Sequence, residues 1–372
     1  MKRGLATACA LVGVSLAASG CGSGSDGAKA GGAVVQMRLT DAGCDPARLE
    51  VRAGPTTFEV RNDGADAVTE LEVLEDGRIL GEAENLAAGL SGRFSLTLRP
   101  GRYVTYCPGG DSAERGTLTV TGTGGRAPSQ GALAAVSRYR RYVETQTGVL
   151  VRRTAAFAAA VRGGDLARAK LLYASARIPY ERIEPVAESF GDLDPAIDAR
   201  AGDVPEARWT GFHPLEQALW VRNSTKGTSR LAARLVADVR ALQRRARTVE
   251  LEPAQVANGS VELLGEVSKS KITGEEERYS HVDLVDFEAN VDGARAAFAA
   301  VRPLVAAPRP QLARLIDRQF AAVASALAPY RRGATFVSYT ELDRADTRRL
   351  SRAIDALAEP LSQVGAIVVR SS

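Results

Sequence analysis

Two regions of the 372-residue chain differ in the spacing of their apolar side chains. From residue 34 to 121, apolar and polar residues alternate in short runs separated by Gly, Pro, Asp and Asn. The clearest runs are VVQMRL, TFEVRN, TELEVLE, RFSLTL, RYVTYC and TLTV. A period of two that is broken by turn residues is typical of strands in an antiparallel sandwich. We therefore predict an all-β Greek-key sandwich over residues 34–121.

The pattern changes to a helical period after residue 131. Apolar residues then recur three and four positions apart, as in LARAKLLYASA, SRLAARLVADVRAL, ARAAFAAVRPL and LARLIDRQFAAVASAL. Breaks at residues 163–165, 223–225 and 308–310 favour helices of bundle length with short connections. We predict an all-α domain over residues 132–372, joined by a Gly/Pro/Ser-rich linker at residues 122–131. The expected fold class is α+β multidomain.

The first 20 residues have the features of an export signal. Lys2 and Arg3 precede an apolar run that ends in small residues before Cys21. Because this run is shorter than the roughly 20 apolar residues of a membrane-spanning helix, we interpret residues 1–20 as a lipoprotein signal peptide. Cys21 would then carry the lipid and residues 21–33 would form a flexible tether. The protein would be extracytoplasmic, anchored to the outer face of the cell membrane. An unlipidated secreted protein is the alternative.

Composition limits the classes of partner and the state of the cysteines. Hydrophobic residues make up 45% of the chain and charged residues 25%, which is ordinary globular usage. The formal net charge is only +4, and two of these charges lie in the signal peptide, so we expect no nucleic-acid partner. Outside the N-terminal segment the cysteines are Cys44 and Cys107. One pair in an oxidising compartment predicts a disulfide.

Residues 34–121 contain no histidine, which excludes a type-1 copper site in the sandwich because such a site needs two. The sandwich does contain clustered glutamates. Glu70 and Glu72 are two positions apart, so on a strand they would face the same side. Carboxylates on one face suit a hard cation, although a solvated strand face is the alternative.

The two histidines of the chain are His213 and His281. His213 lies in GFHPLEQALW, where Pro214 favours the first turn of a helix. Glu216 follows three positions later. One interpretation is a compact nitrogen and oxygen ligand pair on one helix face. The alternative is a capping box, in which Glu216 reaches back to the free backbone donors.

Acidic residues upstream could complete such a site. Glu181, Glu184 and Glu188 recur at i, i+3 and i+7, so a helix would place them on one stripe. If this helix packs beside the one that begins at His213, the carboxylates converge on the imidazole. Alternatively, Arg177 and Arg182 could pair with these acids as weak surface ion pairs.

His281 begins a second candidate site. Asp283 and Asp286 lie one helical turn apart just after it, and the three side chains could hold a second cation. The alternative is a capped helix start, with Ser280 and Asp283 near the cap.

Three long segments resemble the EfeO family of extracytoplasmic iron-uptake proteins: GFHPLEQALW, ARIPYERIEPVAESFGDLDPAIDAR and KITGEEERYSHVDLVDFEANVDG. Cys44-Asp45-Pro46 and the segment from Tyr103 to Pro108 extend the resemblance into the sandwich. The resemblance implies a cupredoxin-like sandwich followed by an imelysin-like (M75) helical domain. It also implies that the protein binds iron, as Fe²⁺ or Fe³⁺, with room for a second divalent cation such as Zn²⁺ or Cu²⁺. The implied partners are an iron permease of the oxidase-dependent transporter type and a haem-peroxidase-like protein of the same system.

The family's His-x-x-Glu motif matches His213 and Glu216. Its acidic ligands fall between Glu181 and Asp194, with these two as first choice and Glu184 in reserve. We expect a binding protein that passes iron to a permease. The alternative is a zinc-dependent M75-type metallopeptidase. Zincin catalysis needs two histidines on one helix with a Glu base, and this motif has one, so we expect no enzymatic activity.

Overall fold

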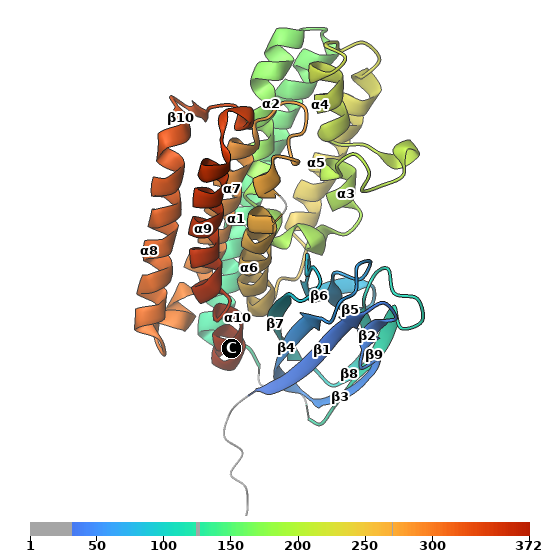
Figure 1. Ribbon diagram of the computed structural model, residues 1–372, viewed down its shortest axis with the longest axis vertical. Helices are drawn as coiled ribbons and strands as arrows, with labels where there is room; N and C mark the ends of the chain where they lie inside the picture. Colours follow the sequence, from blue (N-terminus) through green and yellow to red (C-terminus); the bar gives the residue numbers. More distant parts are fainter. Residues whose placement is uncertain (1–31, 124–126, 270) are drawn as a thin grey trace, which may run out of the picture. The chain divides into compact units, whose positions relative to one another are not determined.

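The alternating segment folds into a sandwich of two sheets (Figure 1). The computed structural model describes residues 32–123, 127–269 and 271–372, and residues 32–372 belong to one compact unit. The predicted signal peptide, Cys21 and nearly all of the tether lie outside the described residues, as does part of the predicted linker. The strands are β1 Ala33–Thr40, β2 Gly43–Asp45, β3 Arg48–Arg52, β4 Gly54–Asn62, β5 Leu71–Glu75, β6 Arg78–Ala83, β7 Ser91–Leu98, β8 Gly101–Tyr106 and β9 Arg115–Thr121.

The six predicted runs fall in β1, β4, β5, β7, β8 and β9, whereas β2, β3 and β6 have no such run. The β2 strand is only three residues long, and Gly81 interrupts the apolar alternation of β6. One sheet has the order β2-β1-β4-β7 and the other β3-β9-β8-β5-β6. The prediction of purely antiparallel pairing is wrong at two places, because β1 pairs with β4 and β3 with β9 in parallel. The remaining pairs of both sheets are antiparallel.

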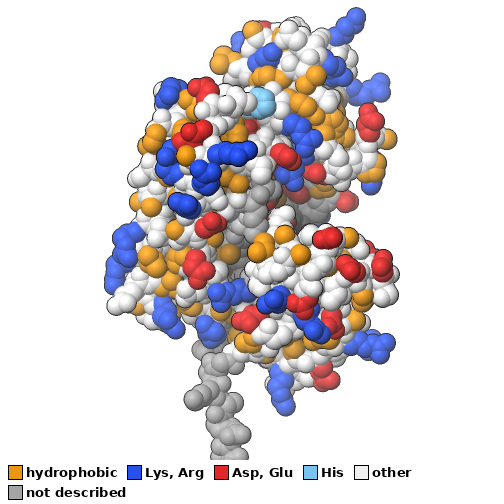
Figure 2. All heavy atoms as spheres, viewed as in Figure 1, with side chains coloured by type: hydrophobic (Ala, Val, Ile, Leu, Met, Phe, Trp, Pro, Cys, Tyr) orange, Lys and Arg blue, Asp and Glu red, His pale blue; other side chains and the backbone are white. Residues whose placement is uncertain are grey.

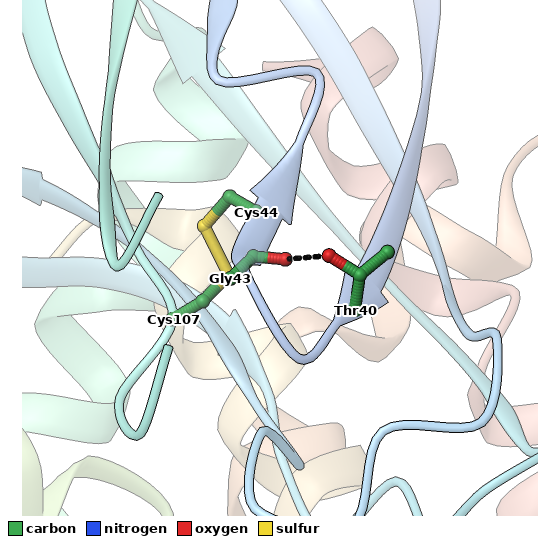
Figure 3. The surroundings of a disulfide bond; sticks show 4 residues. All are labelled: Thr40, Gly43, Cys44 and Cys107. Atoms are coloured by element: carbon green, nitrogen blue, oxygen red, sulfur yellow. Dashed lines mark hydrogen bonds between the residues drawn. A yellow bond between two sulfur atoms is a disulfide. The ribbon is translucent and has the colours of Figure 1, made fainter. Parts of the chain in front are cut away.

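The side chains that alternate inward from the two sheets form the core of the sandwich. Phe58 of β4 and Phe94 of β7 stack with their ring centroids 4.9 Å apart. A disulfide joins Cys44 of β2 to Cys107, which follows β8, with the Cα atoms 5.6 Å apart (Figure 3). Thr40 donates a hydrogen bond to the carbonyl oxygen of Gly43 across the turn that leads into β2. The disulfide therefore links the two sheets covalently.

The second region is helical, with ten α-helices in its described part. They are α1 Gln130–Arg162, α2 Leu166–Glu181, α3 Leu193–Asp198, α4 His213–Trp220, α5 Ser229–Ala246, α6 Pro253–Lys269, α7 Asp283–Ala306, α8 Pro310–Leu327, α9 Arg344–Leu361 and α10 Val364–Ser371. The predicted breaks lie between α1 and α2, between α4 and α5, and between α7 and α8. The long helix α1 contacts α2, α5, α6 and α7 (Figure 1). This arrangement confirms the predicted fold class of a β-sandwich followed by a helical domain.

Shorter elements connect the helices. They are the 3₁₀ segments η1 Glu184–Phe190, η2 Glu206–Arg208, η3 Lys271–Thr273, η4 Ala328–Tyr330 and η5 Tyr339–Glu341, and a hairpin of β10 Arg331–Arg332 with β11 Thr335–Phe336. None of the described helices combines the length and the apolar character that crossing a membrane requires. The segments η1 and η3 matter most for function, because both border the site described below.

The disulfide predicts a selective loss of stability in the sandwich. Cys44 and Cys107 are 63 positions apart, so in the chain-entropy account their bond stabilises the fold by about 4 kcal/mol. Replacing both with alanine should lower the urea midpoint of the β-sheet circular dichroism signal. The fluorescence of Trp209 and Trp220, both in the helical region, should shift less. Wild-type protein treated with dithiothreitol is the control, and an unchanged sheet midpoint in both samples would contradict the prediction.

Candidate metal centre

A group of charged and polar side chains is buried inside the helical domain. They come from α2, α3, α4, η3, α7 and the turns between η3 and α7. We call these residues the charge cluster: Arg177, Glu181, Asp198, His213, Glu216, Lys271, Glu276, Glu277, Asp283, Asp286 and Asn290. Charges are removed from water only where opposite charges or hydrogen bonds compensate them, so such a cluster needs a specific arrangement of partners.

A glycine brings two members of the cluster together. Gly211 has a φ of +96°, and a Cβ atom there would lie 2.1 Å from the carbonyl oxygen of Ile197. Only glycine fits this close approach and this backbone conformation. The backbone N–H of Phe212 then donates to the same carbonyl oxygen at 2.9 Å. As a result, Asp198 at the end of α3 lies beside His213 in the first turn of α4.

Glu216 holds the imidazole of His213 in place. One oxygen of its carboxylate lies 3.3 Å from Nδ1 of His213. The other accepts hydrogen bonds from the backbone N–H groups of Tyr279 and Ser280, at 2.9 and 2.7 Å. The capping-box alternative is wrong, because no side-chain bond caps α4. Glu216 therefore acts as the partner that orients the histidine, which is a common arrangement around metal-binding histidines.

The other ring nitrogen of His213 points to two further carboxylates. Nε2 lies 3.6 Å from Oδ1 of Asp198 and 3.7 Å from Oε1 of Glu276. The side chain is 2% exposed, and within the described part of the chain Nε2 has no hydrogen-bond partner. One ligand atom from each of these three residues lies within 4.8 Å of the other two. A second such group is formed by His213, Glu216 and Glu277. Both groups have the donor chemistry for a cation.

The surrounding charges change the protonation of His213. Burial lowers the pKa of its imidazole, and so does Arg177. The hydrogen bond to Glu216 and the nearby negative charges of Glu276 and Asp198 outweigh both and raise the pKa to about 9. The pKa of the Glu216 carboxyl shifts in the opposite direction. Burial raises its pKa, but His213 and Ser280 outweigh burial, so the pKa is lowered. At neutral pH the metal-free pair is therefore an imidazolium and a carboxylate.

A cavity of about 320 Å³ leads to this site. Asp198 and Glu276 line it together with Glu184, Asp194 and residues of the sandwich such as Glu82 of β6. Figure 2 shows a recess beside the sandwich and side chains of both charges interspersed over the visible face. A smaller void of about 10 Å³ is lined by His213, Glu216 and Glu276 together with two arginines, Arg200 and Arg278. Its volume is close to the lower limit for one water molecule, which is also the size of a small ion.

The predicted acidic ligands take different positions. The helical stripe is wrong, because α2 ends at Glu181 and the chain continues as the 3₁₀ segment η1. Glu181 and Glu184 both accept hydrogen bonds from Lys271 and Asn290. Asp194 accepts a hydrogen bond from Tyr180. None of these three acids belongs to a described group of ligand atoms, so their role as ligands stays a prediction.

Sequence reasoning missed Asp198 and Glu276. Asp198 ends the same acidic stretch as Asp194, and Glu276 is the middle of three consecutive glutamates. The sequence signal for both was a local excess of acids. That signal does not distinguish which carboxylate faces inward, because the backbone around each one is irregular.

Arg177 is the central cation of the cluster. The alternative of a surface ion pair is wrong for this residue, because its side chain is 0% exposed. Its guanidinium forms ion pairs with five carboxylates, those of Glu181, Asp198, Glu276, Glu277 and Asp286. Two of these distances are 3.5 Å to Glu276 and 3.3 Å to Asp286. The ring of Phe212 lies 5.5 Å from the guanidinium carbon.

The structure gives different partners to the three residues of the second candidate site, His281, Asp283 and Asp286. Asp286 contacts Arg177, and Asp283 accepts a hydrogen bond from the backbone N–H of Glu277 at 3.0 Å. The capped-helix alternative is wrong, because no side-chain bond caps α7. His281 is half-buried and joins neither group of ligand atoms. Arg177 thus supplies a cation beside Asp286, and the second metal stays a prediction.

Of the two sandwich acids, one lies within a strand and the other just before it. Glu72 lies in β5 opposite Glu82 of β6, and Glu70 precedes the strand. Neither Glu70 nor Glu72 belongs to a described group of ligand atoms. A cation held by these two residues stays a prediction.

The buried position of Arg177 predicts a large cost of removing its charge. Arg177→Met would leave five carboxylates without their shared cation, and the loss should be about 3–5 kcal/mol of unfolding free energy. Arg182→Met is the matched control, because its ion pair with Asp292 is 33% and 42% exposed and contributes at most about 1 kcal/mol. Urea unfolding followed by tryptophan fluorescence measures both. Similar losses in the two variants would contradict the assignment.

Comparisons with known proteins agree with the two-part architecture. The Imelysin family model matches residues 135–364, and the Cupredoxin-like domain model matches residues 8–120. The chain is 40% identical over 343 residues to the iron uptake system component EfeO of Escherichia coli strain K12 and of Shigella flexneri. These alignments cover 90% of this chain and 91% of each relative.

A solved structure also shares sequence with part of the chain. The novel purple cupredoxin from Nitrosopumilus maritimus is 26% identical, over 23% of this chain and 99% of its own. Its TM-score is 0.19, so it contributes nothing to the assignment. The assignment to a family rests instead on the two family models and on the EfeO relatives. The chain belongs to the EfeO family of iron uptake system components.

Proposed function

We propose that this protein captures iron outside the cytoplasm at His213, Asp198 and Glu276 and passes it to a membrane permease. The observation that carries the proposal is the buried Nε2 atom of His213, which has no hydrogen-bond partner in the described part of the chain and faces two carboxylates. A buried polar atom without a partner is costly, and a bound cation would satisfy it. One imidazole with several carboxylate oxygens suits iron, and also manganese or zinc.

The cavity supports a route for the ion. Asp198 and Glu276 line both the cation position and the cavity, so a hydrated ion could meet these two carboxylates before it reaches His213. Glu216 would keep the ring in the orientation that presents Nε2. The ligands would therefore be in position before the ion arrives, which lowers the entropic cost of ordering them on binding.

Location and partners follow from the N-terminal segment and the family. We propose that Cys21 carries lipid and that residues 21–33 tether the folded part, residues 34–372, to the outer face of the cell membrane. A tethered binder stays at high local concentration beside a transporter. The proposed partners are an iron permease of the oxidase-dependent type and a haem-peroxidase-like protein. A second cation, such as Zn²⁺ or Cu²⁺, would bind at the sandwich acids Glu70 and Glu72.

Peptide hydrolysis is the weaker proposal. A metallopeptidase needs a carboxylate that is free to take a proton from water. Glu216 already accepts two backbone hydrogen bonds and contacts His213, and its pKa is lowered, which makes it a poor base. Zinc-dependent cleavage of peptides that disappears in Glu216→Ala would instead favour the peptidase over the iron-binding protein.

Matched histidine variants test the binding site. His213→Asn removes the proposed nitrogen ligand and should lower Fe²⁺ affinity about a hundredfold, which corresponds to roughly 3 kcal/mol. His281→Asn is the control, because His281 has a φ of +58° that asparagine tolerates and it lies outside both ligand groups. Competition with a chromophoric chelator under anaerobic conditions measures both affinities. Equal affinity in the two variants would refute the site.

The raised pKa of His213 predicts that iron displaces a proton. At pH 7 the imidazole with a pKa of about 9 is protonated, and a metal can bind only its neutral form. Iron affinity should therefore rise with pH up to about 9 and fall as the pH is lowered. Titration calorimetry at pH 7 in two buffers of different ionisation enthalpy should show release of about one proton per ion.

Glu216→Gln is the control for this proton. Losing the carboxylate removes one cause of the raised pKa of His213, so this variant should release less of a proton at pH 7. Binding heats that do not depend on the buffer in the wild-type protein would argue against displacement of the proton.

A further inference from the structure

The side chain of Lys271 lies among carboxylates next to the proposed iron position. Its ammonium nitrogen is 3.4 Å from Oε2 of Glu181 and 3.9 Å from Oε2 of Glu276, and it also pairs with Glu184. The residue is 4% exposed. It comes from η3, a three-residue segment that follows α6. Glu181, Glu184 and Glu276 pair with this buried ammonium group, and the charge of Glu266 also acts on it. The acids form a cation site that the chain fills with its own side chain.

Glu276 belongs to this site and to the proposed iron site at the same time. Its Oε1 atom lies 3.7 Å from Nε2 of His213, and its Oε2 atom faces Lys271 and lies 3.2 Å from the guanidinium of Arg200. An iron ion between His213, Asp198 and Glu276 would therefore lie close to the ammonium group. Two positive ions at such short range inside a protein repel each other strongly.

We propose that Lys271 is an internal competitor of iron for Glu276, so that its charge weakens iron binding and its ammonium group leaves when iron binds. This inference rests on the proposed function, because it assigns a residue that sets the affinity of the same site. A lysine can fill this role because its charge is compact and its four-carbon stem is flexible. The cavity lined by Glu184 and Glu276 lies next to the ammonium group and gives it a direction in which to move.

The alternative role of Lys271 makes the opposite prediction. If the ammonium group only held Glu181, Glu184 and Glu276 in position, removing it would scatter the carboxylates and weaken iron binding. If it competes, removing it frees Glu276 and strengthens iron binding. The direction of the change in affinity therefore separates the two roles.

The first experiment compares Lys271→Met with Lys271→Arg in the full-length protein. Methionine keeps the length of the side chain and removes its charge, whereas arginine keeps the charge. We expect Lys271→Met to bind Fe²⁺ about tenfold more tightly and to release it more slowly to a chelator, while Lys271→Arg stays near the wild-type affinity. Weaker or unchanged binding by Lys271→Met would overturn the proposal.

The second experiment needs no substitution. Acetylation by a soluble N-hydroxysuccinimide ester, followed by mass spectrometry, measures how accessible each lysine amine is. Lys271 is buried and should react slowly in the metal-free protein, and Fe²⁺ should speed its acetylation several-fold. Lys226 is exposed and serves as the internal control, with a rate that iron should not change. A rate at Lys271 that iron lowers or leaves unchanged would refute the displacement.

The two experiments separate failure of this inference from failure of the proposed site. If wild-type protein binds iron and His213→Asn does not, but Lys271 keeps its slow acetylation, only the competition is wrong. If neither the wild-type protein nor Lys271→Met binds iron, both proposals fail. In His213→Asn the effect of iron on Lys271 should disappear, because the ion would no longer occupy the position beside Glu276.

Discussion

Carboxylates that leave water need a cation beside them, and this constraint governs the helical domain around Arg177. The guanidinium binds carboxylates from α2, α3, α7 and the turns before α7, so it links elements that are far apart in sequence. In a low dielectric each unpaired carboxylate would cost several kcal/mol. The buried acids nevertheless outnumber the buried cations Arg177 and Lys271. Burial also raises the pKa of Glu277 and of Asp286, which opposes their ionisation, so this excess of acids is not an equal excess of negative charge.

The hydrogen bonds of Glu216 fix the orientation of His213 among these acids. Two backbone donors before α7 fix its carboxylate, and the carboxylate fixes Nδ1 of His213. Nε2 is then the ring atom left to face Asp198 and Glu276. The His-x-x-Glu spacing is explained by this geometry, since one helical turn places the glutamate where it can hold the ring. Under the proposed function, the motif contains one ligand, His213, and the glutamate that orients it.

Periodicity predicted the layers of the molecule well and its charge cluster poorly. Alternation located six strands, and helical spacing located the main breaks, because both patterns report on which face of an element is apolar. The cluster depends instead on irregular backbone. Glu184 does not lie on the expected helical stripe, because α2 ends at Glu181. Asp198 lies beside His213 because the chain turns at Gly211. Local sequence patterns do not show which distant segments come into contact. For that reason the sequence did not predict that Arg177 and Lys271 are buried.

An iron carrier must release its ion as well as bind it, and the cluster suits both steps. Arg177, Lys271 and the protonated His213 compensate the carboxylates while no iron is present, so the metal-free protein keeps its fold. A divalent ion attracts Glu276 and Asp198 more strongly than a single ammonium charge does, whereas a monovalent ion gains nothing by the exchange. The same internal cations oppose the bound ion and make its departure easier. Under the proposed function, a tether would keep the protein beside its transporter, and moderate affinity would then be sufficient because local concentration replaces tight binding.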